Sequence, residues 1–188
     1  MLILASASPR RNELLRLITP DFTVDVSDAD ETLPEGLDAH DAVALLARRK
    51  AEAVAARHSD GDAVIGADTV VVLDGAILGK PHGREDAARM LHALAGRTHT
   101  VVTGVCVLAG GRSECFTAEA RVAFAAMSEA EIAAYLDTGE PFDKAGAYGI
   151  QGFGARYIER VEGDYPAVVG LPVHPLYAAL RRMGLLSV

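Results

Sequence analysis

Strand-like and helix-like patterns of apolar residues alternate along the chain. Short runs rich in β-branched residues predict strands, and apolar residues three or four positions apart predict helices. The expected strands are residues 2–5, 22–26, 63–73, 98–109, 112–124 and 156–161. The expected helices are residues 9–18, 39–58, 84–94 and 129–137, with one more after Pro172. The mixture, with a long hairpin at 98–124, predicts an α/β fold with a mixed sheet.

Capping and turn residues mark the boundaries of these elements. Ser8, Asp38 and Ser128 each directly precede a helical pattern, as N-cap residues do, and Pro9 suits the first helical position. The pairs Asp74-Gly75 and Gly110-Gly111 are typical of two-residue hairpin turns.

The helix start at residues 8–11 departs from the usual charge preference. Backbone N–H groups and the macrodipole favour acidic residues there, yet Arg10 and Arg11 occupy the first turn. Two cations beside free amide donors favour an anion, and arginine binds phosphate in bidentate fashion. An ordinary cap with solvated arginines is the alternative. The chain lacks both the P-loop and the dinucleotide-binding glycine motif.

Two charged residues fall in otherwise apolar patterns. Lys50 lies in the middle of the apolar face of the 39–58 helix, where its stem either reaches out to solvent or points an ammonium into a site. Asp68 interrupts the 63–73 strand and is costly there unless it is paired, metal-bound or at a strand end. It could hold a divalent cation or accept a proton from an attacking water, or simply mark a bulge.

Three further residues are weaker candidates. Lys80 follows the Asp74-Gly75 turn, which would return it towards Asp68, although a surface turn explains it equally well. Glu31 stands in an acidic loop that could supply metal ligands or be merely solvated. Gln151 lies in a glycine-rich loop, and its amide offers both a donor and an acceptor to a base edge.

Composition and charge bound the function. The 188 residues suffice for a single domain, taken as residues 1–188. The formal net charge of −8 argues against nucleic acid as a partner, so a polyanionic ligand must be held locally or through a cation. No apolar run approaches the ~20 residues of a membrane span, which makes a cytoplasmic protein without membrane attachment the default.

The two cysteines lack the spacing of a metal site. Cys106 and Cys115 stand symmetrically about Gly110-Gly111, so a hairpin turn would place them on facing positions. Because cytosolic thiols normally stay reduced, we expect them to be free thiols.

Taken together, the motifs resemble the Maf family of nucleoside triphosphate pyrophosphatases over nearly the whole chain. The matching segments are Ser-x-Ser-Pro-Arg-Arg at 6–11, Arg-Arg-Lys-Ala at 48–51, Gly-Ala-Asp-Thr at 66–69, Gly-Lys-Pro at 79–81 and Val-Gly-Leu-Pro at 169–172. Residues 143–152 resemble the subgroup that acts on dTTP and UTP.

The resemblance implies a mixed twisted sheet with flanking helices and two lobes around a central cleft, similar to inosine triphosphatases. It implies hydrolysis of the α–β phosphoanhydride of a nucleoside triphosphate, with Mg or Mn as cofactor, in the cytoplasm, by a protein that commonly forms homodimers. The implied general base is Asp68, with Glu31, Lys50 and Lys80 as further catalytic or phosphate-contacting residues. From their own chemistry, Asp68 and Glu31 are the expected metal ligands. The resemblance associates Arg10, Thr69 and Gln151 with substrate preference, and the helix start adds Ser8 and Arg11 as candidate substrate-binding residues. A nucleotide-sensing or cell-division regulatory protein and a related phosphatase are the alternatives.

Overall fold

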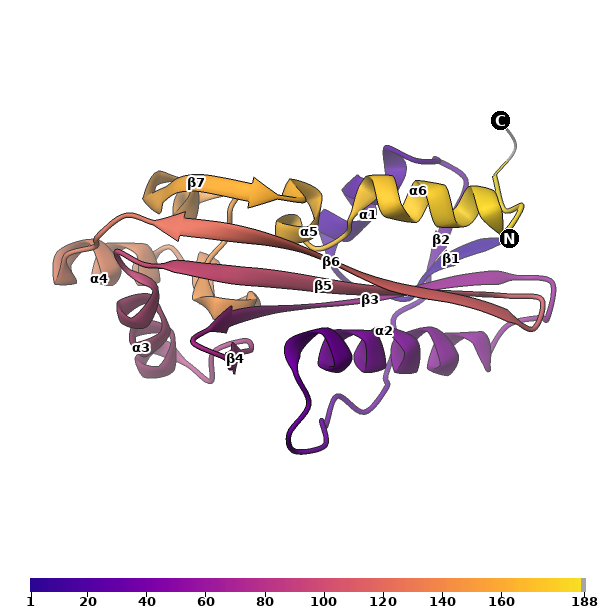
Figure 1. Cartoon of the computed structure of the whole chain (residues 1–188), viewed down its shortest axis with the longest axis horizontal. Helices are drawn as coiled ribbons and strands as arrows, with labels where there is room; N and C mark the ends of the chain where they lie inside the picture. Colours follow the sequence, from indigo (N-terminus) through magenta and orange to yellow (C-terminus); the bar gives the residue numbers. More distant parts are fainter. Residues whose placement is uncertain (187–188) are drawn as a thin grey trace. The chain divides into compact units, whose positions relative to one another are not determined.

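The computed structural model describes residues 1–186, which form a mixed α/β fold (Figure 1). Within them, seven strands make one sheet in the order β2-β1-β3-β5-β6-β7, with β4 paired to β3. The strands are β1 (Leu2–Leu4), β2 (Thr23–Val24), β3 (Ala63–Leu73), β4 (Ala76–Leu78), β5 (Thr98–Ala109), β6 (Arg112–Phe124) and β7 (Ile158–Gly163). The helices are α1 (Pro9–Arg16), α2 (Ala39–Ala55), α3 (Arg84–Leu94), α4 (Glu129–Asp137), α5 (Tyr165–Val169) and α6 (Val173–Arg182). The predicted fold class is therefore confirmed.

The chain divides into two compact units. Unit 1 comprises residues 1–69, 103–118 and the segment from Gly170 onward, and unit 2 comprises residues 70–102 and 119–169. The long strands β3, β5 and β6 each contribute residues to both units. Within the described residues, no helix combines the length and the apolar composition needed to cross a membrane.

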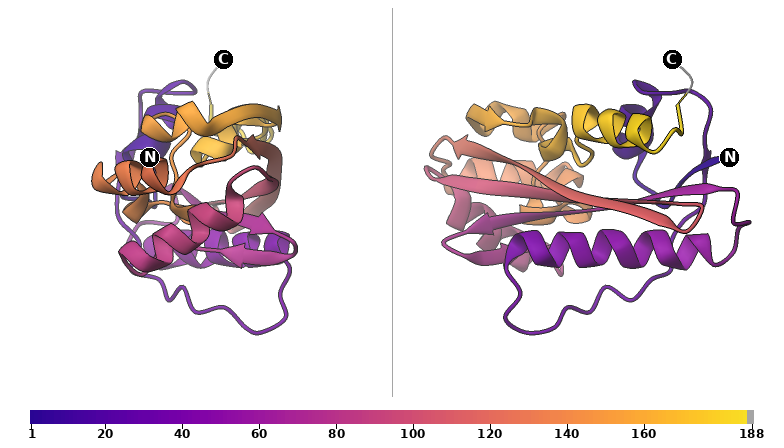
Figure 2. Two further views of the ribbon diagram at one scale, coloured as in Figure 1. Left: turned by 90° about the vertical axis from the view of Figure 1, so that its left-hand side faces the viewer. Right: turned by 45° about the vertical axis from the view of Figure 1, so that its right-hand side comes forward.

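Unit 1 is built on parallel pairing of β1 with β2 and with β3, in the registers Ile3↔Thr23 and Ile3↔Val64. In this unit α2 covers one face of the sheet and α6 the other (Figures 1 and 2). Small side chains allow α2 to pack closely, and its buried face joins a core cluster with the strands. That cluster consists of Ile3, Ala5, Ala47, Ala51, Val54, Val64 and Cys106.

Two glycines bring the backbone of α2 against the sheet. A Cβ built at Gly66 of β3 would lie 2.1 Å from the carbonyl oxygen of Ala47, and one built at Gly104 of β5 would lie 2.5 Å from that of Val43. Real Cβ atoms do not approach so closely, so only glycine fits at either position. The side chains on the buried face of α2 therefore lie close to β3.

Unit 2 holds the second core, in which α3 and α4 pack with the aromatic residues of the segment that follows. The Asp74-Gly75 turn has φ angles of 51° and 80°, as a type I′ turn requires, and pairs Val71 with Leu78. The segment after α4 contains three short 3₁₀ helices, η1 (Glu140–Asp143), η2 (Ala145–Ala147) and η3 (Phe153–Tyr157). The strand expected at 156–161 begins at Ile158 because η3 occupies the preceding residues.

Other differences from the sequence-based elements are small. Helix α2 ends at Ala55, not at residue 58, because Arg57 and His58 form a tightened turn whose amides bond to the carbonyls of Val54 and Ala55. The short helix α5 was not expected. At five residues between Gly163 and Gly170 it is too brief to show a helical period.

The cysteines contradict the expectation of free thiols. Gly110 and Gly111 adopt φ angles of 55° and 71°, and this tight turn places Cys106 and Cys115 on facing strands with their Cα atoms 4.1 Å apart. The structure joins the two residues in a disulfide. The turn geometry suggested by the sequence is thus confirmed, whereas the expected redox state is wrong.

Candidate active site

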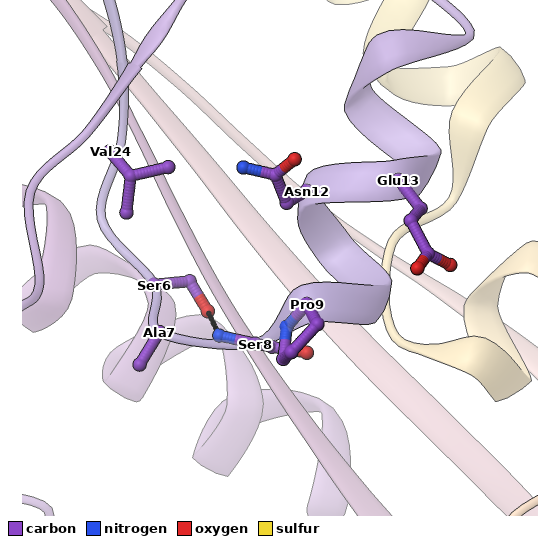
Figure 3. A pocket seen from close by; sticks show the side chains of 7 residues that line it. All are labelled: Ser6, Ala7, Ser8, Pro9, Asn12, Glu13 and Val24. Carbon is purple, nitrogen blue, oxygen red and sulfur yellow. Dashed lines mark hydrogen bonds between the residues drawn. The ribbon is translucent and has the colours of Figure 1, made fainter.

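The loop between β1 and α1 forms a polar turn at the start of the helix. Ser8 is the N-cap, and its hydroxyl accepts a hydrogen bond from the amide of Arg11, as predicted for a capping residue. The Ser8 amide in turn donates to the Ser6 hydroxyl at 3.2 Å (Figure 3). A pocket of about 310 Å³ opens beside this turn (Figure 3). It is lined by Ser6, Ala7, Ser8, Pro9, Asn12, Glu13 and Val24.

Arg11 holds this turn to the rest of unit 1. Its Nε donates to the carbonyl oxygen of Gly170 at 2.8 Å, and its two terminal nitrogens donate to the hydroxyls of Ser6 at 3.3 Å and Thr69 at 3.0 Å. All three acceptors are uncharged. These neutral oxygens fix the guanidinium in position without cancelling its charge.

The electrostatic surroundings of Arg11 show which candidates share its neighbourhood. Burial lowers the pKa of the Arg11 guanidinium, the negative charges of Asp68 and Glu31 raise it, and the positive charge of Arg10 lowers it further. Thus three of the predicted site residues of unit 1, Asp68, Arg10 and Glu31, lie close enough to act electrostatically on Arg11.

Lys50 bridges the two candidate carboxylates. Its Nζ lies 2.6 Å from Oδ1 of Asp68 and 2.8 Å from Oε1 of Glu31. The side chains of Lys50 and Asp68 are only 13% and 11% exposed, whereas that of Glu31 is 60% exposed. The ammonium thus does not reach out to solvent from the apolar face of α2, and Asp68 is paired, as a carboxylate in an apolar strand must be.

This pairing follows from the close packing of α2 on β3. Lys50 stands between Ala47 and Ala51, the two residues whose backbone lies against Gly66, and Asp68 lies two positions beyond Gly66 on the same face of the strand. The missing side chain at Gly66 therefore sets the distance from which Lys50 reaches Asp68.

Two residues of this region were not singled out from the sequence. Arg49 donates to the carbonyl oxygens of Asp30 at 3.2 Å and Thr32 at 2.6 Å, and so fixes the backbone on both sides of Glu31. The hydroxyl of Thr103 is completely buried and lies 2.8 Å from that of Thr69. A polar threonine before Gly104 in the apolar β5 run is a signal that could have identified Thr103. The position of Arg49 in the sequence carries no such signal.

Lys80 and Gln151 belong to unit 2. Lys80 is exposed two residues after β4, and the carbonyl oxygen of its neighbour Gly79 accepts a hydrogen bond from the amide of Gly146 at 3.0 Å. Gln151 is exposed in the segment between η2 and η3. The structure thus gathers Ser8, Arg10, Arg11, Glu31, Lys50, Asp68 and Thr69 in unit 1, and places the remaining two candidates in unit 2.

The carboxylates of Asp68 and Glu31 suit a hard divalent cation. Both converge on the ammonium of Lys50, so one small region already favours positive charge. Within residues 1–186, no cluster of three or more His, Cys, Asp or Glu side chains could hold a metal. Mg²⁺ is commonly bound by one or two carboxylates together with substrate phosphates, and these two residues fit that pattern.

The fold and this cluster are those of a mixed α/β protein with a candidate anion-binding site. The site combines a fixed arginine at a helix N-terminus with two carboxylates bridged by a lysine. The model of the family described as Maf-like protein matches residues 1–183, and the chain belongs to this family.

Relatives agree with the assignment, and a solved structure shares the fold. The chain is 50% identical over 185 residues to a dTTP/UTP pyrophosphatase of Koribacter versatilis, covering 98% of this chain and 95% of the relative. It is also 50% identical over 185 residues to the dTTP/UTP pyrophosphatase of Myxococcus xanthus, at 98% and 93% coverage. The Staphylococcus aureus Ham1 protein superimposes with a TM-score of 0.55 at 16% identity, covering 97% of this chain and 98% of that one, which shows a shared fold.

Proposed function

We propose that this chain is a nucleoside triphosphate pyrophosphatase that hydrolyses the α–β phosphoanhydride of dTTP and UTP, releasing the nucleoside monophosphate and pyrophosphate. The observation that carries the proposal is the Glu31–Lys50–Asp68 bridge beside an arginine that donates to three neutral oxygens. The names of relatives up to 50% identical over nearly the full length support the substrate.

The start of α1 is the proposed phosphate-binding region. The fixed guanidinium of Arg11, the neighbouring Arg10 and the capping turn at Ser8 together offer cationic groups and backbone donors to a polyanion. Lys80 is proposed as a further phosphate contact. These cations would stabilise the charge that develops on the leaving pyrophosphate.

Asp68 is the proposed general base. Its carboxylate is held by Lys50 at 2.6 Å and is nearly buried, so its position is defined before substrate binds. A bound Mg²⁺ or Mn²⁺ would supply Lewis-acid polarisation of the phosphate, and Asp68 and Glu31 are the residues that would hold it. Lys50 keeps the two carboxylates together, and its ammonium can bind a phosphate oxygen in place of one of them when substrate is bound. Positioning and electrostatics do most of the work in phosphoryl chemistry, so no nucleophilic side chain is needed.

Base recognition is assigned to Thr69 and Gln151. The Thr69 hydroxyl is already engaged by Arg11 and Thr103, so its contribution would be to fix Arg11 as well as to contact substrate. Gln151 is exposed, and its amide can donate to one position of a pyrimidine and accept from another.

The decisive test combines a nucleotide panel with the variant Asp68→Asn. Purified protein is incubated with dTTP, UTP, CTP, dATP and GTP in Mg²⁺ or Mn²⁺, and the products are separated by chromatography. The wild type is expected to release monophosphate and pyrophosphate from dTTP and UTP. Asp68→Asn should lower turnover by about 10²- to 10⁴-fold, the usual contribution of a general base. Asp60→Asn is the matched control, because Asp60 is exposed and its loss changes the charge equally.

Each alternative has its own outcome. Intact dTTP and UTP would refute the proposal, and release of inorganic phosphate would point to a phosphatase. A folded protein that binds the nucleotides by calorimetry without cleaving them would point to nucleotide sensing. Wild-type turnover by Asp68→Asn would remove Asp68 from the role of base.

The homodimer, the cytoplasmic location and the single domain over residues 1–188 remain predictions. Analytical ultracentrifugation of the full chain tests the first, because a monomeric mass at micromolar concentration would contradict it.

A further inference from the structure

Glu140, which the proposed mechanism does not use, accepts three hydrogen bonds from its own unit. Its Oε1 accepts from the Tyr135 hydroxyl at 2.7 Å and from the Gly154 amide at 3.1 Å, and its Oε2 accepts from the Phe153 amide at 2.7 Å. Both carboxylate oxygens are thereby committed inside the protein. Such charge-assisted bonds are stronger than neutral ones, so Glu140 fixes the backbone at residues 153–154.

Tyr135 extends the same network to the other end of the loop. Its hydroxyl donates to Glu140 and accepts a hydrogen bond from the Gly149 amide at 3.0 Å, and the residue is only 2% exposed. Burial, together with the bond to Glu140, raises the pKa of Tyr135, so the hydroxyl keeps its proton and remains a donor.

Glu140 itself stays ionised. Burial raises the pKa of its carboxyl, but the bonds from Tyr135, Gly154 and Phe153 and the charge of Lys144 outweigh that influence and leave the pKa below its usual value. At neutral pH the network is therefore a carboxylate surrounded by donors.

At three glycines of the loop, a side chain would collide with this network or its neighbours. A Cβ at Gly152 would lie 2.1 Å from Oε2 of Glu140, and one at Gly154 would lie 2.6 Å from the Tyr135 hydroxyl oxygen. A Cβ at Gly149 would come within 3.0 Å of Oε1 of Glu140. The loop backbone thus lies directly on the carboxylate and the phenol, which leaves little freedom at positions 149 and 152–154.

We infer that Glu140 and Tyr135 are positioning residues that hold the 149–154 loop in the conformation that presents Gln151 to the pyrimidine base. The inference rests on the proposed function, since it deepens the base recognition assigned there to Gln151. Both ends of the loop are anchored, and Gln151 lies exposed between the anchors. An amide held in this way can discriminate a donor and acceptor pattern, which a freely moving loop could not do.

The variant Glu140→Gln tests the anchor with almost no change in size. One carboxylate oxygen becomes an NH₂ group that faces a donor, either Phe153 N–H or the Tyr135 hydroxyl and Gly154 N–H, so at least one bond to the loop is lost. We expect KM for dTTP and UTP to rise about tenfold, with kcat within a few-fold of wild type, because the proposed general base lies outside the network. The preference for UTP over CTP should fall several-fold.

A matched control and a second variant accompany it. Glu159→Gln makes the same change at an exposed position of β7 and should leave both quantities unchanged. Tyr135→Phe removes the hydroxyl that joins Gly149 to Glu140 and should shift KM and base preference in the same direction. If Glu140→Gln does not fold, Tyr135→Phe tests whether the anchor network affects KM and base preference.

Amide NMR of the nucleotide-free protein gives a readout that does not depend on turnover. The Phe153 and Gly154 amides should move upfield and exchange faster with solvent in Glu140→Gln, because their carboxylate acceptor is lost. An unchanged KM and base preference in folded Glu140→Gln would overturn the inference, and so would a loss confined to kcat and thermal stability. Failure of the proposed function is distinguishable, because it would appear as wild-type protein that leaves dTTP and UTP intact.

Discussion

Gly66→Ala is the most direct perturbation of the contact that holds Lys50 over Asp68. The new Cβ would lie 2.1 Å from the carbonyl oxygen of Ala47 and 2.7 Å from the amide nitrogen of Ala51, both of them backbone atoms of α2. To restore a separation of 3 Å, α2 must withdraw from β3 by about 1 Å, because a close-packed interior offers no room to yield elsewhere.

The size of the effect follows from this displacement. Overpacking of this kind costs roughly 1–3 kcal/mol, which corresponds to a fall in Tm of about 2–12 °C for a chain of this length. Lys50 moves with α2, so its 2.6 Å contact with Asp68 lengthens. A misplacement of about 1 Å at a reacting centre can cost about 10²-fold in rate, and we expect kcat for dTTP to fall by that order.

Thermal unfolding and steady-state pyrophosphate release from dTTP measure the two effects on the same preparation. Gly61→Ala is the matched control, since Gly61 belongs to the same unit, has no left-handed φ and has nothing within 4 Å of an added Cβ. Gly66→Ala with the Tm and kcat of wild type would refute the argument that close packing at this glycine sets the Lys50–Asp68 distance.

Two further predictions concern stability. Burial lowers the pKa of His99 from 6.5 to about 4, so the unfolded chain binds a proton between these values that the folded protein does not. Stability should therefore be fully present above pH 6.5 and decline by roughly 3 kcal/mol as the pH falls towards 4. Urea unfolding at pH 7.5 and 4.5 should show this decline in wild type and less of it in His99→Gln, and equal declines would contradict the assignment. The disulfide between Cys106 and Cys115 should leave no alkylatable thiol in denatured, unreduced protein, and reduction should lower stability by up to about 3 kcal/mol for so short a loop. Mass spectrometry that finds two alkylated cysteines without reduction would show the bond to be absent.

Local rules of capping and turn chemistry account for most of the elements. Ser8, Asp38 and Ser128 begin their helices at the expected residues, and the Asp74-Gly75 and Gly110-Gly111 turns place their strands correctly. These features depend on neighbours in sequence, which is why the pattern predicts them. Among the elements that were missed or shifted, α5 is too short for periodicity to register, and the start of β7 is displaced by the 3₁₀ helix before it.

From the residues themselves, the candidate site shows most clearly where a residue breaks its local pattern. Lys50 on an apolar helix face and Asp68 in an apolar strand are visible as exceptions, and the structure places them 2.6 Å apart. Arg49 and Glu140 break no pattern, because a charged residue on a helix face or in a loop is ordinary. Their importance lies in tertiary hydrogen bonds to backbone 17 to 19 and 13 to 14 residues away, which one-dimensional periodicity does not contain.

The charge balance of unit 1 bears on how a chain of net charge −8 would bind the polyanionic substrate proposed for it. Around Arg11 the positive charges of Arg10 and Lys50 are opposed by Asp68 and Glu31, so this group of five carries only one net positive charge. A triphosphate carries several negative charges, and binding it beside two carboxylates would be repulsive without further cations. In the proposed function Lys80 is one further cation, and a divalent ion held by those same carboxylates would supply the rest. If the proposed function holds, the carboxylates would make substrate binding dependent on the metal, which the arginines alone would not.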